Sequence, residues 1–370
     1  MKNILFIGYY FEPYPGVGAK RISYWVNELN RVSNGEFFPT IITATVPTIE
    51  VANKTSKFNL IFLADDKKPI FNRYINFDPG YSWYFALKEY LDSLDHFKYE
   101  CVVLSGNPFL HFYISRYLKI RFKTKIILDF RDPFANNPLF INSILIKKLI
   151  KKKLEQLYIS YADLVISVNK YCLSLLEIND NSKLLIIENG YDERVISELK
   201  PINIDIEYVN FIYTGKISIG RSPKFFLDIV NSNKSFKVHY FGEDSLLLPL
   251  HENIIDHSYK SYRDVLSYIN ACDFCIVISS GLTFESTTKV FDYIALSKPI
   301  IVFSSNLIIE GSLYDLSESY KDIYFFNSIN SEFLAFIANF KPKDISLDPI
   351  NYSRLNGLKI LINNIKNVTG

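Results

Sequence analysis

The alternation of short apolar runs with longer amphipathic stretches is the feature that most constrains the fold of this chain. Such alternation is typical of βαβ units, in which a parallel sheet is buried between helices. Two amphipathic segments, 19–29 and 82–94, are expected as helices. The expected strands are the apolar runs 4–10, 40–45, 101–105, 125–129, 164–168, 209–214, 237–241, 275–279 and 299–303. The sequence therefore predicts an α/β protein with parallel sheets.

A polar stretch near 190–207 separates two series of predicted strands. Because 370 residues, of which 48% are apolar, can bury more than one core, we predict two Rossmann-like, doubly wound domains with a cleft between them. Their predicted limits are 1–195 and 205–345. The last helix, at about 350–368, has no following strand to pack beneath, and we expect it to return to the first domain.

The net charge of +2 and the 22% of charged residues argue against a disordered chain and against a dedicated nucleic-acid binder. The sequence lacks an apolar stretch of about 18 residues that could span a bilayer, and its apolar start is typical of a strand rather than a signal peptide. We therefore expect a cytoplasmic protein. Cys272 and Cys275 form a C-x-x-C with no second pair, inside an apolar run, which favours buried structural cysteines over a zinc or redox site.

Ligands of open parallel sheets bind beyond the carboxyl ends of the strands, so the loops after the predicted strands are the candidate sites. After the first strand, Gly16 and Gly18 precede a helix whose free N–H groups suit a phosphate. The dinucleotide-binding fingerprint is incomplete because Arg21 stands at its third glycine position. A plain tight turn is the alternative for this loop.

Charged side chains follow two further strands. Asp132 can bind a sugar hydroxyl or act on an acceptor proton, and the adjacent Arg131 can hold a phosphate or orient that carboxylate. Helix capping by Asp129 or Asp132 and a structural ion pair are the alternative. After the strand 209–214, Lys216 and Arg221 suit a diphosphate leaving group, with a solvated basic turn as the alternative.

The fourth loop begins at Glu285 and leads to Pro299. We expect Ser286 or Thr287 to cap a helix with Lys289 in its first turn, where a cation is disfavoured unless an anion is bound. Asp292, further along, is placed to reach a ribose or sugar hydroxyl. The predicted nucleotide-sugar contacts of this loop are Glu285, Ser286, Thr287, Thr288, Lys289 and Asp292.

These four loops, in this order, resemble the large retaining glycosyltransferase family with two Rossmann-like domains, known as the GT-B fold, and its family 4 branch in particular. The resemblance covers nearly the whole chain. It is carried by Gly16–Gly18, Leu128–Pro133, Ala162–Val168, Glu188–Asp192, Tyr213–Gly215 with Arg221, and Thr288–Tyr293.

The resemblance implies transfer of a sugar from a UDP-sugar, more than a GDP-sugar, to a glycan or lipid-linked acceptor in surface polysaccharide synthesis. It also implies retained anomeric configuration, a nucleotide-sugar as substrate and no metal or other cofactor. By the same resemblance, Gly16 and Gly18 lie against the donor phosphates, Lys216 and Arg221 bind the diphosphate, and Asp132 lies near the reacting sugar.

The sequence departs from the family pattern in the fourth loop. The family has two glutamates there at a fixed spacing, and this chain has Asp292 at the second position and Phe284 at the first, with Glu285 beside it. Two alternative functions stay open: a sugar-nucleotide epimerase of the same fold, and a non-catalytic nucleotide-sugar-binding protein.

The stretch 144–157 combines an apolar stripe with several lysines. The lysines are Lys147, Lys148, Lys151, Lys152 and Lys153. A helix of this kind can rest on an anionic membrane where a lipid-linked acceptor waits, so we expect peripheral membrane contact. The alternative is an ordinary surface helix with a solvated lysine face.

Overall fold

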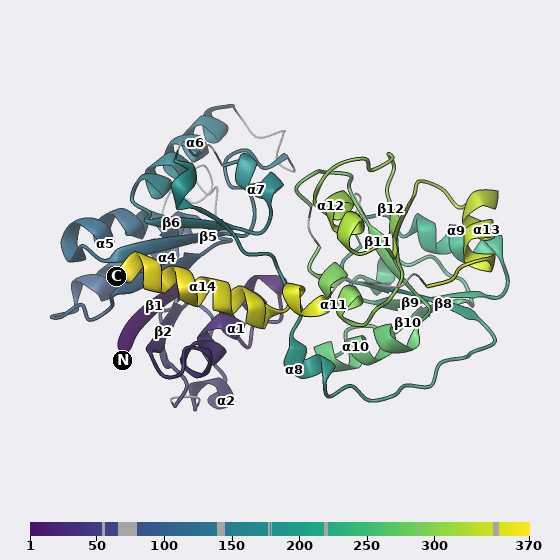
Figure 1. The fold of residues 1–370 in the computed structure, drawn as a ribbon, viewed down its shortest axis with the longest axis horizontal. Helices are drawn as coiled ribbons and strands as arrows, with labels where there is room; N and C mark the ends of the chain where they lie inside the picture. Colours follow the sequence, from purple (N-terminus) through teal and green to yellow (C-terminus); the bar gives the residue numbers. More distant parts are fainter. Residues whose placement is uncertain are drawn as a thin grey trace. The chain divides into compact units, whose positions relative to one another are not determined.

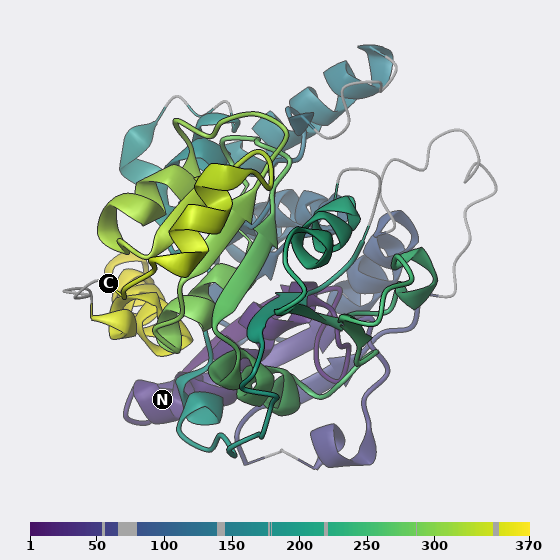
Figure 2. The same cartoon turned by 90° about the vertical axis from the view of Figure 1, so that its right-hand side faces the viewer.

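The structure, a computed structural model, describes residues 1–53, 56–65, 80–138, 145–176, 178, 180–217, 221–285, 287–342 and 348–370. These residues form two compact units. Unit 1 consists of Met1–Glu188 and Asn356–Gly370, and unit 2 consists of Asn189–Leu355. Each unit has one parallel sheet with helices on its faces (Figures 1 and 2). The prediction of two Rossmann-like parallel-sheet domains is therefore confirmed.

The sheet of unit 1 has seven strands in the order β3-β2-β1-β4-β5-β6-β7. In that order the strands are Asn59–Phe62, Phe37–Thr43, Lys2–Gly8, Cys101–Ser105, Lys125–Phe130, Leu164–Ser167 and Leu184–Ile186. The helices of this unit are α1 (Val17–Val32), α2 (Ile49–Ala52), α4 (Tyr81–Asp92), α5 (Ile114–Phe122), α6 (Leu145–Ser160), α7 (Lys170–Ser174) and α14 (Arg354–Thr369). The central strands β1, β4 and β5 are almost wholly buried, as expected of strands covered on both faces.

Helix α14 belongs to unit 1 from Asn356 onward, although it follows the whole of unit 2 in the sequence. It lies along the helical layer that contains α1 (Figure 1). Leu358, Leu361 and Ile365 are completely buried, and Lys366 Nζ lies 2.5 Å from Glu36 Oε2. The helix therefore completes the core of unit 1.

The sheet of unit 2 has six strands in the order β10-β9-β8-β11-β12-β13. In that order they are Ile254–Asp256, Phe236–Phe241, Val209–Thr214, Phe274–Ile278, Ile300–Phe303 and Ile323–Phe326. The helices are α8 (Glu193–Ile196), α9 (Lys224–Ser232), α10 (Tyr262–Ala271), α11 (Lys289–Ala295), α12 (Ser312–Ser319) and α13 (Ser331–Ala338).

The residues of β11 show how this sheet separates two cores. Cys275 and Val277 point into a cluster with residues of α10, α11 and α12, whereas Phe274, Ile276 and Ile278 point into a second cluster with α9 and α13. Alternate residues of a strand face opposite sides of a sheet, so a strand buried on both faces must be apolar throughout. Cys272 and Cys275 are buried free thiols, in agreement with their structural interpretation.

Among the described residues, no helix is both long and apolar enough to cross a bilayer.

Candidate functional site

Three loops meet around Arg131 at the carboxyl edge of the unit 1 sheet. The Arg131 guanidinium donates hydrogen bonds to the backbone carbonyls of Gly18 and Gly106, and Nη2 lies 3.5 Å from the carbonyl oxygen of Asn107. These carbonyls belong to the start of α1 and to the loop after β4. Because the N–H groups of the Arg131 guanidinium donate to backbone carbonyls of unit 1, the arrangement supports a positioning role for Arg131 rather than the predicted phosphate contact.

A second arginine, Arg21 on α1, lies in the interior of the same unit. Its Nη2 is 3.0 Å from Asp129 Oδ1, and its Nη1 donates to the carbonyl of Ile187 at 2.7 Å. Ser105 Oγ donates to the other oxygen of Asp129 at 2.8 Å. Burial lowers the pKa of Arg21 and Asp129 partly restores it, so the pair is a structural ion pair. This is the alternative considered for Asp129, and the buried role of Arg21 was not predicted.

Asp132 follows this network and its side chain is exposed. No helix begins at Asp129 or Asp132 in the described segment 129–138, so neither residue is a helix cap. Asp132 therefore stays a candidate for contact with a substrate.

His111 is a buried residue that the sequence did not single out. It is completely buried and packs edge-on against Trp83 and Phe112. Burial, together with the charge of Arg131, lowers its pKa to about 3. The imidazole is therefore neutral at ordinary pH, and a lone histidine in an apolar run gives no signal by which it could be recognised from sequence.

Of the two glycines of the first loop, Gly16 has the closer contacts. Gly16 precedes α1 at the N-cap position, and a Cβ there would lie 2.3 Å from the ring of Tyr14. Tyr14 in turn stacks on Tyr10, with ring centroids 4.3 Å apart. A Cβ on Gly18 would meet Tyr10 at 3.4 Å and Arg131 at 3.7 Å. A side chain at position 16 would therefore require the exposed Tyr14 ring to move.

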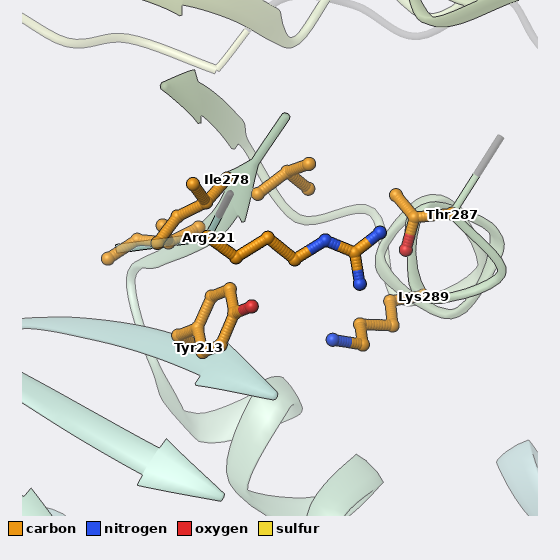
Figure 3. A pocket seen from close by; sticks show the side chains of 7 residues that line it. Tyr213, Arg221, Ile278, Thr287 and Lys289 are labelled. Atoms are coloured by element: carbon orange, nitrogen blue, oxygen red, sulfur yellow. The ribbon is translucent and has the colours of Figure 1, made fainter. Parts of the chain in front are cut away.

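Unit 2 contains a shallow hollow, open to solvent, at the carboxyl edge of its sheet. Its lining residues come from β8, from β11 and from the two segments predicted to contact the nucleotide-sugar, the loop with Arg221 and the segment 285–299. They are Tyr213, Arg221, Ile276, Val277, Ile278, Thr287 and Lys289. Figure 3 shows the Arg221 guanidinium extending toward Thr287 and Lys289 across this hollow. The structure therefore brings Arg221, Thr287 and Lys289 together.

Glu285 fixes the position of Arg221. Its Oε1 lies 3.0 Å from Arg221 Nη2, and its Oε2 accepts hydrogen bonds from Ser279 Oγ at 2.7 Å and from the backbone N–H of Ser280 at 2.9 Å. The Glu285 side chain is only 12% exposed, whereas that of Arg221 is 39% exposed. One oxygen of Glu285 thus binds the loop after β11, and the other holds the Arg221 guanidinium at the hollow.

The side chain of Lys289 packs against Gly215. Gly215 has a φ of +123°, and a Cβ there would lie 1.8 Å from Lys289 Nζ. The ammonium group also lies 4.8 Å from the centroid of the Tyr213 ring. Burial raises the pKa of Tyr213 to about 12, so the phenol stays protonated, and its hydroxyl donates to the carbonyl of Lys216 at 2.9 Å. The glycine that follows β8 therefore provides the space that Lys289 occupies.

The other predicted residues of unit 2 lie outside the lining of the hollow. The Lys216 side chain is exposed, and Asp292 Oδ1 accepts a hydrogen bond of 2.5 Å from Tyr262 Oη. Ser286 is outside the described residues. The capping prediction is wrong, because α11 begins at Lys289 with Thr288 at its N-cap position and no side-chain capping bond. Thr287 instead lines the hollow.

No protein-family model matches this sequence, and a search of curated proteins finds no match. Solved structures match along its whole length. Sucrose-phosphate synthase from Thermosynechococcus elongatus is 12% identical, with a TM-score of 0.67 over 100% of this chain and 95% of its own. HepE from Anabaena, in complex with UDP and glucose, is 10% identical, with a TM-score of 0.64 over 99% of this chain and 100% of its own.

An enzyme of another reaction class matches as well. UDP-GlcNAc 2-epimerase from Neisseria meningitidis, bound to UDP-GlcNAc, is 12% identical, with a TM-score of 0.61 over 99% of this chain and 100% of its own. Likeness at such low identity concerns the fold and not the reaction. Together with the two parallel sheets, it shows that this chain has the GT-B fold.

Proposed function

We propose that this protein is a glycosyltransferase that binds a nucleotide-sugar in the hollow of unit 2 and transfers its sugar to a glycan or lipid-linked acceptor. The convergence of Arg221 and Lys289 on one hollow carries this proposal. Two cations facing one space suit a diphosphate, whose negative charge grows as the glycosidic bond breaks. The UDP complex of HepE, which has the same fold, favours UDP as the nucleotide.

The proposed roles follow the contacts of each residue. Arg221 and Lys289 bind the diphosphate, and the Thr287 hydroxyl donates to it. Glu285 positions Arg221 through the ion pair of 3.0 Å. Lys216, Ser286, Thr288 and Asp292 are proposed as further contacts to the donor, in accordance with the family resemblance. In unit 1, we propose Gly16 and Gly18 for the donor phosphates and Asp132 for the reacting sugar or the acceptor.

The finer features of the reaction are part of the same proposal. We propose retention of the anomeric configuration and a place in surface polysaccharide synthesis, both on the family resemblance. We also propose that the reaction needs no metal, because the two cations at the hollow can neutralise the leaving diphosphate.

Titration calorimetry with UDP and with UDP-sugars tests the donor site. Arg221→Ala and Lys289→Ala should each weaken binding by roughly 10- to 100-fold, since each removes a charge-assisted hydrogen bond to phosphate. Lys234→Ala is the matched control, because it removes an exposed lysine of the same unit away from the hollow. Equal affinity of all three variants and the unaltered protein would refute the assignment of the donor site.

The fold shared with UDP-GlcNAc 2-epimerase makes epimerisation the second candidate. Incubation with UDP-GlcNAc or other UDP-sugars in the absence of acceptor distinguishes the two. A transferase leaves the UDP-sugar intact until an acceptor is added. An epimerase converts the UDP-sugar to its epimer without any acceptor. Binding without turnover in the presence of glycan and lipid-linked acceptors would instead indicate a non-catalytic binding protein.

A further inference from the structure

The first turns of α6 present apolar side chains to solvent. Leu145 is 71% exposed, Ile146 66%, Leu149 52% and Ile150 38%. Figure 2 shows this part of α6 projecting from the body of unit 1. Exposed apolar residues are ordinary when they occur singly, but a contiguous group of this kind marks an interaction surface. We call these four residues the apolar face of α6.

The apolar face points away from the protein interior. Tyr158 and Glu155 are the buried residues of α6, and the Lys151 ammonium lies 5.3 Å from the centroid of the Phe134 ring. At about 100° per residue, these inward positions fall on the side of the helix opposite to the apolar face. An ordinary surface helix turns its apolar stripe inward, so the orientation here is reversed.

Lysines border the apolar face along one edge and beyond its C-terminal end. Lys148 and Lys152 lie along one edge of the apolar face. Lys153 lies on the same side of the helix as the apolar face, one turn after Leu149. No acidic residue occurs between Asp132 and Glu155, so the segment is uniformly basic. The long apolar stems of lysines allow their ammonium groups to reach outward while the neighbouring apolar side chains are buried.

We propose that the first turns of α6 dock in the plane of an anionic lipid bilayer, with the apolar face among the acyl chains and the lysines at the phosphate groups. Apolar burial and attraction to anionic lipid are the two contributions that hold interfacial helices on membranes. A second copy of this chain fits the surface less well, because two lysine clusters would face each other. The inference does not depend on the proposed transferase activity.

Sedimentation of the full-length protein with lipid vesicles tests this surface. Vesicles of phosphatidylglycerol and phosphatidylcholine should pellet the protein at low salt, and pure phosphatidylcholine vesicles should not. Lys148→Gln with Lys152→Gln should reduce partitioning about 30-fold, and Ile146→Gln with Leu149→Gln at least about 10-fold. Glutamine is a good helix former, so both variants should keep the helical circular dichroism of the unaltered protein.

Two matched controls carry the same substitutions elsewhere on unit 1. Lys98→Gln with Lys123→Gln removes two exposed lysines, and Ile49→Gln with Ile120→Gln removes two exposed isoleucines. Both controls should pellet like the unaltered protein. The proposal is overturned by absence of pelleting at low salt, by equal pelleting of all variants, or by a dimer in solution that Ile146→Gln with Leu149→Gln dissociates.

Discussion

Glu285 lies one residue after Phe284, the position at which the family resemblance expects the first of two glutamates. Its contacts point to another role. Both carboxylate oxygens are engaged within unit 2, one with Arg221 and the other with the loop after β11. These contacts indicate that Glu285 influences a bound ligand indirectly, by positioning the Arg221 guanidinium.

This positioning role predicts how Glu285→Ala alters binding. UDP itself, which carries no sugar, should bind about 10-fold more weakly, because Arg221 loses its anchor. A direct contact between Glu285 and the sugar would instead leave UDP affinity unchanged and weaken only UDP-sugar binding. Calorimetry with both ligands separates the two. In a double-mutant cycle with Arg221→Ala, the effects should be far from additive, because the residues act as one unit.

Gly215→Ala should damage the donor site through the position of Lys289. The φ of +123° is strained for any residue with a Cβ, and the added methyl would displace the Lys289 ammonium. We expect a loss of about 1–3 kcal/mol in the free energy of unfolding together with clearly weaker UDP binding. Gly35→Ala is the control: φ there is +78° and nothing lies within 4 Å, so it should lower stability but spare UDP affinity. Equal UDP binding by both variants would contradict this role for Gly215.

At the scale of elements, the apolar runs predicted the central strands of both sheets and missed four strands, β3, β7, β10 and β13. All four lie at the edges of their sheets. Their residues are mostly half-buried or exposed, and three of these strands contain apolar runs, at 60–63, 184–187 and 323–326, that the predicted set of strands left out. The predicted strands therefore cover the interior of each sheet and omit the edge strands.

The candidate site, too, could be predicted only in part from the sequence. Strand ends were sufficient to place Arg221, Thr287 and Lys289 near one another, because the carboxyl ends of parallel strands share one edge. The helix start was placed too early, and the Glu285 ion pair and the burial of Arg21 were not foreseen. These features depend on which side chains meet across loops, and a linear pattern carries no information on such contacts.

Helix α14 allows an element-scale prediction. Leu361→Ala removes a fully buried side chain from the helix that closes unit 1, and should lower the free energy of unfolding by about 2–5 kcal/mol. Hydrogen exchange should become faster in β1 and β2 and stay unchanged in β8 and β11, because the lost contacts belong to unit 1. Asn363→Ala, on the exposed side of the same helix, is the control and should leave exchange in both units unaltered. Faster exchange in unit 2 alone would contradict the placement of α14.

At the scale of the whole molecule, the charge is nearly balanced, but the cations are unevenly distributed. The net charge is only +2, yet lysines are concentrated on α6 in unit 1 and two cations converge on the hollow of unit 2. The first group suits the proposed lipid surface and the second the proposed diphosphate. Each unit thus contributes its own binding surface to the proposed reaction.

The complete reaction provides the last prediction. If Arg221 and Lys289 neutralise the leaving diphosphate, sugar transfer should continue at an unchanged rate after treatment with EDTA, since no divalent ion is then needed for that charge. Release of UDP in the presence of acceptor measures this rate. Lys289→Ala should slow it by roughly 10- to 100-fold, and added Mg²⁺ should not restore it. Loss of transfer in EDTA that Mg²⁺ reverses would show that a metal ion, rather than these two side chains, carries the charge of the leaving group.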